Sequence, residues 1–131
     1  MRVVLLTAIM LALTPRSAPA QPADCDNAQT QLDLSTCAAR NAKAADDALA
    51  QSYDALNKSV SPAGRQKLDA AKEAFKAYRS AQCTFNTAGA EGGSIYPMAF
   101  SECLETLTKA QNSILQQQLN CAEGDISCGG Q

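Results

Sequence analysis

The chain has 131 residues with 11 Lys and Arg, 13 Asp and Glu and no histidine, so its formal net charge is -2 at neutral pH. A nucleic-acid binder or an anionic-membrane binder carries a basic face, so this charge balance argues against both classes. Histidine is the commonest general base and metal ligand, and its absence leaves no catalytic residue, metal or cofactor to be expected.

The first twenty residues are typical of a cleavable secretion signal. Arg2 gives a basic start, and the apolar run 3–13 is too short for a permanent membrane span. Small residues at Ala18 and Ala20 supply a cleavage site, so we expect a mature chain of residues 21–131 that is periplasmic or secreted and not membrane-inserted. Cleavage removes Arg2 and Arg16, which leaves 9 basic against 13 acidic residues and a net charge of -4.

The mature part is expected to form one all-α domain, an elongated antiparallel three-helix bundle stapled by disulfides. Apolar residues in segments 30–58, 62–86 and 96–119 recur every three or four positions, which is the period of one helix face. The residues expected to face inward are Leu34, Cys37, Ala38, Ala42, Ala45, Leu49, Tyr53 and Leu56, then Leu68, Ala71, Phe75, Tyr78 and Gln82 or Cys83, then Phe100, Cys103, Leu104, Leu107, Gln111, Ile114 and Leu119. Asp46 and Asp47 fall off the first stripe, on a solvated face.

The breaks between these helices carry their own signals. Ser61 followed by Pro62 predicts a helix start, because a hydroxyl caps the first turn and proline suits its first position. Residues 87–94 contain three glycines and predict an irregular loop. Ser94 follows two of them, and we interpret it as the N-cap of the third helix rather than as a nucleophile.

The six cysteines are expected to be disulfide-bonded, because an exported chain meets an oxidising compartment. In an up-down-up bundle, Cys25, Cys37, Cys83 and Cys103 fall at one end and Cys121 and Cys128 at the other. Since a disulfide needs Cα atoms within about 7 Å, the last two pair with each other. Three pairings remain for the other four, and we favour Cys25–Cys37 with Cys83–Cys103.

Two groups of residues have the chemistry of a functional site. Glu102 with Glu105, and Asp46 with Asp47, are acidic pairs of the kind a glycosidase uses, although solvated helix faces carry such pairs routinely. Tyr78 and Arg79 are residue types enriched in binding hot spots. We favour a structural role for Arg79, which can cap carbonyls or pair with a nearby acid.

The mature chain resembles the N-terminal domain of LprI-like lysozyme inhibitors, a group of secreted bacterial helical domains, in a series of motifs that follow the same order along the chain. The matching segments are 30–38, Ala45-Asp46 with Leu49 and Tyr53, 71–83, Gly92-Gly93-Ser94-Ile95, Cys103-Leu104, Leu107-Thr108 and 121–128. The chain departs from the family by having Phe75 where Trp is frequent and Leu34 where Met is frequent, and both changes keep an apolar residue.

The resemblance implies a protein that binds and blocks a lysozyme-type muramidase. On this reading the glycine-rich loop enters the sugar-binding cleft, with Glu91, Gly92, Gly93, Ser94 and Tyr96 as the candidate contacts, together with Tyr78 and Arg79. Because a shared scaffold does not fix a shared partner, the alternative is a non-inhibitory module that binds another envelope protein. A cell-wall hydrolase that uses the paired carboxylates is a third and weaker interpretation.

Overall fold

The computed structural model describes residues 24–122, 125, 126 and 128. The expected signal segment 1–20 and the mature start at Gln21 lie outside these residues. The described part contains α1 (Gln31–Ser59), α2 (Pro62–Asn86), the short 3-10 helix η1 (Ala88–Ala90) and α3 (Tyr96–Leu119), and it has no strand. The expectation of an all-helical protein is confirmed, and the helix limits agree with the predicted segments to within one residue.

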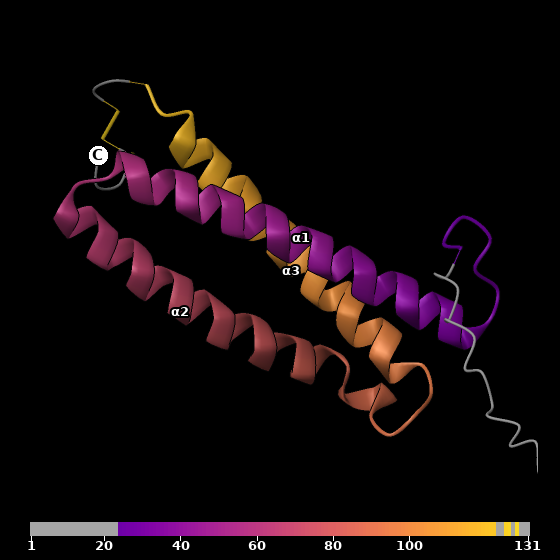
Figure 1. Ribbon diagram of the computed structural model, residues 1–131. Helices are drawn as coiled ribbons and strands as arrows, with labels where there is room; N and C mark the ends of the chain where they lie inside the picture. Colours follow the sequence, from indigo (N-terminus) through magenta and orange to yellow (C-terminus); the bar gives the residue numbers. More distant parts are fainter. Residues whose placement is uncertain (1–23, 123–124, 127, 129–131) are drawn as a thin grey trace, which may run out of the picture.

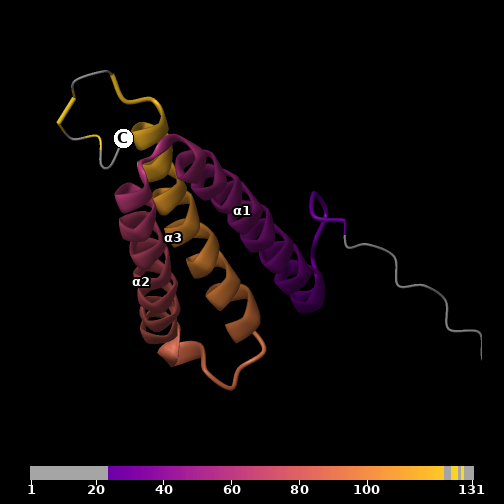
Figure 2. The same cartoon turned by 60° about the vertical axis from the view of Figure 1, so that its left-hand side comes forward.

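The three helices run up, down and up in an elongated arrangement (Figures 1 and 2). Helices α1 and α3 pack closely along much of their length, and α2 makes fewer contacts with either of them. None of the helices in the described range is both long and apolar enough to cross a membrane.

Local sequence signals explain where α1 and α2 begin. The Thr30 hydroxyl accepts a hydrogen bond from the Asp33 backbone N–H at 3.1 Å and donates one to the Asp33 carboxylate at 2.6 Å. The Ser61 hydroxyl accepts a hydrogen bond from the Gly64 N–H at 3.1 Å, and Pro62 occupies the first turn, as predicted. Each hydroxyl satisfies a backbone donor that has no partner inside its helix.

The core is thin and lies toward the turn between α1 and α2. Leu49, Tyr53 and Leu56 of α1 are buried with Leu115 of α3. The residues that pack against this cluster are Leu68, Phe75 and Leu119. Ala38, Ala42 and Ala45 of α1 are buried as well, and their short side chains allow a neighbouring helix to approach closely.

The inward orientation that the sequence predicted for four residues is wrong. Leu34, Tyr78 and Ile114 are 37%, 54% and 52% exposed, and Ala71 is exposed as well. The cause is helix phase, because adjacent residues point about 100° apart. Arg79 and Cys83 lie on the inner face of α2, which turns Tyr78 outward. On α3 the inner face continues from Thr108 to Leu115, so Leu115 occupies the core and Ile114 does not.

Disulfides tie both ends of the bundle. Cys25–Cys37 and Cys83–Cys103 lie at one end, and their Cα atoms are 5.6 Å apart in each pair. Cys121–Cys128 lies after α3, with a Cα separation of 5.9 Å. These are the favoured pairings, and the sorting of four cysteines to one end and two to the other is confirmed.

Candidate functional site

The loop between α2 and α3 is built by backbone turns and by one buried hydroxyl. Thr87 follows α2, is buried, and donates its hydroxyl proton to the Cys83 carbonyl at 2.7 Å. Helix η1 continues the turn, and the Gly93 N–H donates to the Ala90 carbonyl at 3.0 Å. Gly92 has φ of +77°, a conformation that favours glycine. The loop therefore has a defined shape, held next to the Cys83–Cys103 disulfide.

Most of the expected contact residues of this loop are accessible. Glu91, Gly92, Gly93 and Ser94 are exposed. Tyr96 is half-buried, because it begins α3 and stacks on Phe100 with ring centroids 5.6 Å apart. The interpretation of Ser94 as a helix cap is wrong, since the cap position is Ile95 and no side chain caps this helix.

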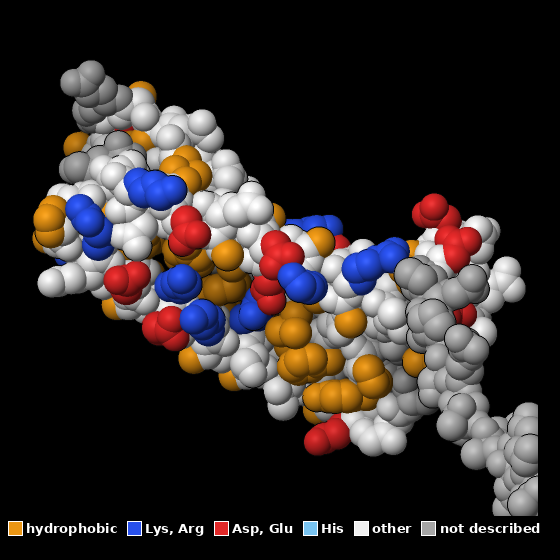
Figure 3. Space-filling model, viewed as in Figure 1, with side chains coloured by type: hydrophobic (Ala, Val, Ile, Leu, Met, Phe, Trp, Pro, Cys, Tyr) orange, Lys and Arg blue, Asp and Glu red, His pale blue; other side chains and the backbone are white. Residues whose placement is uncertain are grey.

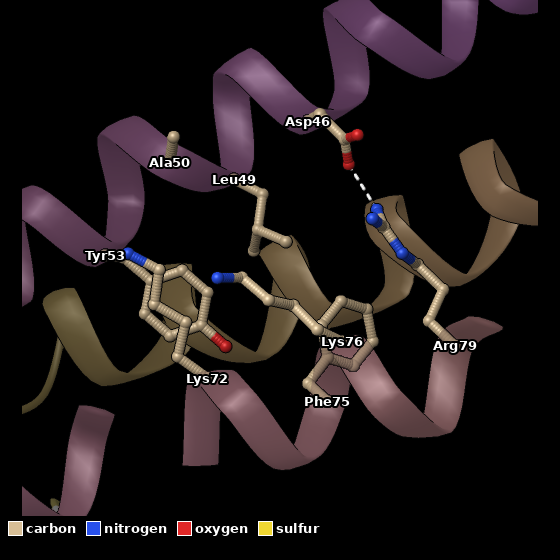
Figure 4. Close-up of a pocket in the computed structure, with 8 residues that line it drawn as sticks. All are labelled: Asp46, Leu49, Ala50, Tyr53, Lys72, Phe75, Lys76 and Arg79. Atoms are coloured by element: carbon tan, nitrogen blue, oxygen red, sulfur yellow. Dashed lines mark hydrogen bonds and ion pairs between the residues drawn. The ribbon is translucent and has the colours of Figure 1, made fainter. Parts of the chain in front are cut away.

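Tyr78 and Arg79 point in different directions from α2. Tyr78 is exposed and remains available to a partner. The side chain of Arg79 is only 17% exposed, and its guanidinium lies between the helices (Figure 4). Its Nη1 donates to the Asp46 carboxylate of α1 and, at 2.5 Å, to the Thr108 hydroxyl of α3. Arg79 therefore has the structural role that the sequence analysis favoured.

Asp46 is partly solvated, with 45% of its side chain exposed, and it also pairs with Arg79 from α2. Its neighbour Asp47 is exposed and forms an ion pair with Lys43 at 2.6 Å. The other acidic pair is divided as well: Glu102 is exposed, and Glu105 pairs with Lys109 at 2.5 Å. Neither pair offers the two unpaired carboxylates facing one cleft that glycoside hydrolysis requires.

The end of the bundle that carries the loop between α2 and α3 is predominantly acidic. The segments that form it, 24–39 and 80–104, contain Asp24, Asp26, Asp33, Glu91 and Glu102 and no Lys or Arg. The Asn27 amide donates to the Asp24 carboxylate at 2.9 Å, and this hydrogen bond lowers the pKa of Asp24. The charge of the exposed Arg40 lowers the Asp24 pKa as well, so one basic residue accompanies the acidic ones at this end.

The same end displays large apolar side chains. Phe85, near the end of α2, is 78% exposed, Ile95 before α3 is 47% exposed, and Leu32 at the start of α1 is 76% exposed. A continuous hydrophobic area covers the adjoining parts of α2 and α3 at the lower right of Figure 3. Leu32, Phe85, Glu91 and Ile95 lie at the same end of the bundle, and we call this set the loop-end surface.

Phe85 and Ile95 were missed as candidate contacts. For Phe85 a signal was present in the sequence, since Leu68, Phe75 and Cys83 define one face of α2 and an aromatic residue two positions after Cys83 lies off that face. Exposed apolar residues that cluster at one site of a protein surface mark interaction sites more often than scattered ones do.

Three potential metal-ligating groups, Cys121, Asp125 and Cys128, lie close together after α3. The two sulfurs are bonded to each other, so neither is a thiolate. Metal ligation by cysteine requires the thiolate, and this group is therefore a disulfide turn rather than a metal centre.

Comparison with known proteins gives a family match and one informative relative. Residues 23–115 match the family described as Lysozyme inhibitor LprI. An uncharacterized protein of Rhizobium meliloti (strain 1021) is 30% identical over 131 residues, which span 90% of this chain and 94% of the relative. No solved structure gives a significant match. The matched region contains all three helices up to Leu115, and so includes the loop-end surface and the polar contacts of Arg79.

Proposed function

The chain belongs to the LprI lysozyme inhibitor family, and on that basis we propose that it is an exported, non-catalytic protein that binds a lysozyme-type muramidase and blocks its cleft. The proposal includes removal of residues 1–20 and action in the periplasm or outside the cell. The signal-like start of the sequence supports export. The engaged state of Asp46, Asp47 and Glu105 in ion pairs supports binding rather than hydrolysis.

The observation that carries the proposal is the coincidence of two properties at the loop-end surface. Its large side chains Phe85 and Ile95 are exposed and apolar. Acidic residues predominate at this end, because segments 24–39 and 80–104 contain five Asp and Glu and no Lys or Arg, although Arg40 lies near Asp24. An apolar centre within a negative surround complements a cationic enzyme that has an apolar or aromatic cleft for sugars.

Each property has a separate task in this mechanism. The acidic residues, Glu91 and Glu102 among them, accelerate the encounter with a cationic partner, an effect that salt screens. Phe85 and Ile95 bury apolar area and set the rate of dissociation. The exposed loop 91–94 enters the cleft between them, and Tyr78 contributes to the rim.

The test is inhibition of muramidases from several lysozyme classes by the mature protein, measured as lysis of cell-wall suspensions. We expect Phe85→Ala and Ile95→Ala to weaken inhibition about tenfold or more, as hot-spot truncations do. The matched control is Ile114→Ala, because Ile114 is also exposed but lies toward the other end of α3. Absence of inhibition and of binding across all classes would remove the proposal, and capture of another envelope protein would then favour the non-inhibitory module.

Charge is tested separately. Glu91→Gln and Glu102→Gln are expected to slow association at low salt and to have little effect at high salt. Asp54→Asn is the control, because Asp54 is exposed and lies on α1 away from the loop. Equal effects of the two kinds of substitution would show that net charge, and not the loop-end surface, governs the encounter.

A further inference from the structure

A hollow of about 180 Å³ lies between α1 and α2, away from the loop-end surface (Figure 4). Its apolar lining is Leu49, Ala50 and Tyr53 from α1 and Phe75 from α2. In Figure 3 it is visible as a recess with hydrophobic side chains in its depth and charged side chains around it. An apolar cavity of roughly 150 Å³ is large enough for a benzene-sized ring, so the hollow has room for a small apolar body.

The charges around the hollow are mostly positive. Lys72, Lys76 and Arg79 line it, with Asp46 as the single acid among its lining residues. The pairing of Arg79 with Asp46 removes one charge of each sign. The ammonium groups of Lys72 and Lys76 remain, and Lys76 is itself paired with Glu73.

Lys72 differs from Lys76 in its pairing. Lys76 donates to the Glu73 carboxylate at 2.8 Å, and this hydrogen bond holds the pKa of Glu73 below its usual value. Lys72 takes part in none of the ion pairs found within the described residues, and its Nζ lies 5.4 Å from the centroid of the Tyr53 ring. The Lys72 charge also lowers the pKa of Glu73, but no ion pair joins these two residues. Lys72 is thus a half-buried ammonium beside an aromatic wall and outside any ion pair in the described residues, which makes it a binding group for an anion.

We propose that this hollow binds a small carboxylic acid with an aromatic or medium-length aliphatic body. The apolar body lies against Leu49, Tyr53 and Phe75, and the carboxylate accepts hydrogen bonds from the Lys72 ammonium. Ala50 has a short side chain at the hollow and leaves room for the ligand to enter. This site goes beyond the proposed muramidase binding and does not depend on it, since it shares no residue with the loop-end surface.

The experiment is a titration of the isotope-labelled mature protein with octanoate and with phenylacetate, followed by amide NMR shifts. We expect saturable shifts at Tyr53, Lys72 and Phe75. Octylamine and octanol, which have the same or a similar chain without the negative charge, are expected to bind about fivefold more weakly or worse, as the loss of one charge-assisted contact implies. Equal binding of octylamine would overturn the proposal, and so would shifts confined to other parts of the chain.

Two variants locate the site. Lys72→Gln is expected to weaken octanoate binding about fivefold, while Lys58→Gln, an exposed lysine in the last turn of α1, leaves it unchanged. Ala50→Phe fills the hollow from an exposed position and is expected to abolish binding without loss of the fold. A glutamate-rich peptide that binds at Lys72 more tightly than octanoate would overturn the small-molecule proposal in favour of an acidic protein segment.

Discussion

Arg79 on α2 donates a hydrogen bond to the carboxylate of Asp46 on α1, although the two residues are 33 positions apart in the sequence. The same nitrogen donates to the hydroxyl of Thr108 on α3, and Thr108 is fully buried. One guanidinium thus connects all three helices, and α2 has fewer contacts with α1 and α3 than these two have with each other. We call Asp46, Arg79 and Thr108 the Arg79 cluster. The Arg79 Nε–H has no partner within the described residues, so the cluster is held through Nη1.

The first prediction concerns this cluster. Arg79→Met is expected to lower the free energy of unfolding by about 1–3 kcal/mol, because it leaves the buried Thr108 hydroxyl with fewer partners and removes the counter-charge of Asp46. Lys76→Met is the control. Like Arg79, Lys76 lies on α2 and pairs with a carboxylate, but its partner Glu73 is on the same helix and the pair is exposed. It is expected to change stability by less than about 1 kcal/mol.

Urea unfolding of both variants checks this prediction, with Asp46→Asn added to complete a double-mutant cycle with Arg79→Met. A coupling energy near zero between Arg79 and Asp46 would contradict it. Equal destabilisation by the Arg79 and Lys76 substitutions would contradict it as well.

The helix limits and the sorting of the cysteines to the two ends of the bundle were predictable because their causes are local or topological. Ser61 with Pro62 marks a helix start wherever it occurs, and the glycines at 89, 92 and 93 interrupt any helix. The cysteines could be sorted because the alternation of three helices fixes which end each one occupies. None of these inferences needed the relative rotation of the helices.

The Arg79 cluster and the loop-end surface were not predictable in full, because both depend on that rotation. Periodicity placed Tyr78 and Arg79 beside one stripe but did not decide which of them turns inward. The decision comes from the contacts of Arg79 with the other two helices, which have no signal in the sequence of α2. The exposure of Phe85 follows from the same rotation.

The second prediction concerns the glycines of the loop. Gly92→Ala is expected to destabilise the protein by about 1–2 kcal/mol, because φ is +77° and a side chain disfavours that conformation even though the space around it is open. Gly89→Ala is the control, since its Cβ also meets nothing within 4 Å and its φ lies outside the left-handed region. It is expected to be neutral or slightly stabilising. Thermal unfolding distinguishes the two, and equal melting temperatures would contradict the prediction.

The third prediction concerns the staple beside the loop. Replacement of Cys83 and Cys103 by alanine is expected to lower stability by about 3 kcal/mol, as closure of a loop with sequence separation 20 implies. Replacement of Cys121 and Cys128, with separation 7, is expected to lower it by only about 2 kcal/mol. Cys83 is also completely buried, which adds a packing loss to the first variant. Denaturant unfolding gives both values, and a larger effect of the Cys121–Cys128 replacement would contradict the order.

The fourth prediction is a dependence of stability on alkaline pH that arises from Tyr53. Burial raises the pKa of Tyr53 above its ordinary value of 10.0, although a hydrogen bond from Gln111 partly opposes this effect. As the pH rises, Tyr53 therefore ionises in the unfolded chain before it ionises in the folded one. The contribution of Tyr53 to the free energy of unfolding is complete below about pH 10 and falls as the pH rises toward the folded pKa. We expect Tyr53→Phe to flatten this fall in urea unfolding measured from about pH 8 to about pH 11, and Tyr78→Phe, at an exposed position, to leave it unchanged. Parallel curves for the wild type and Tyr53→Phe would show that the loss at high pH comes from other groups.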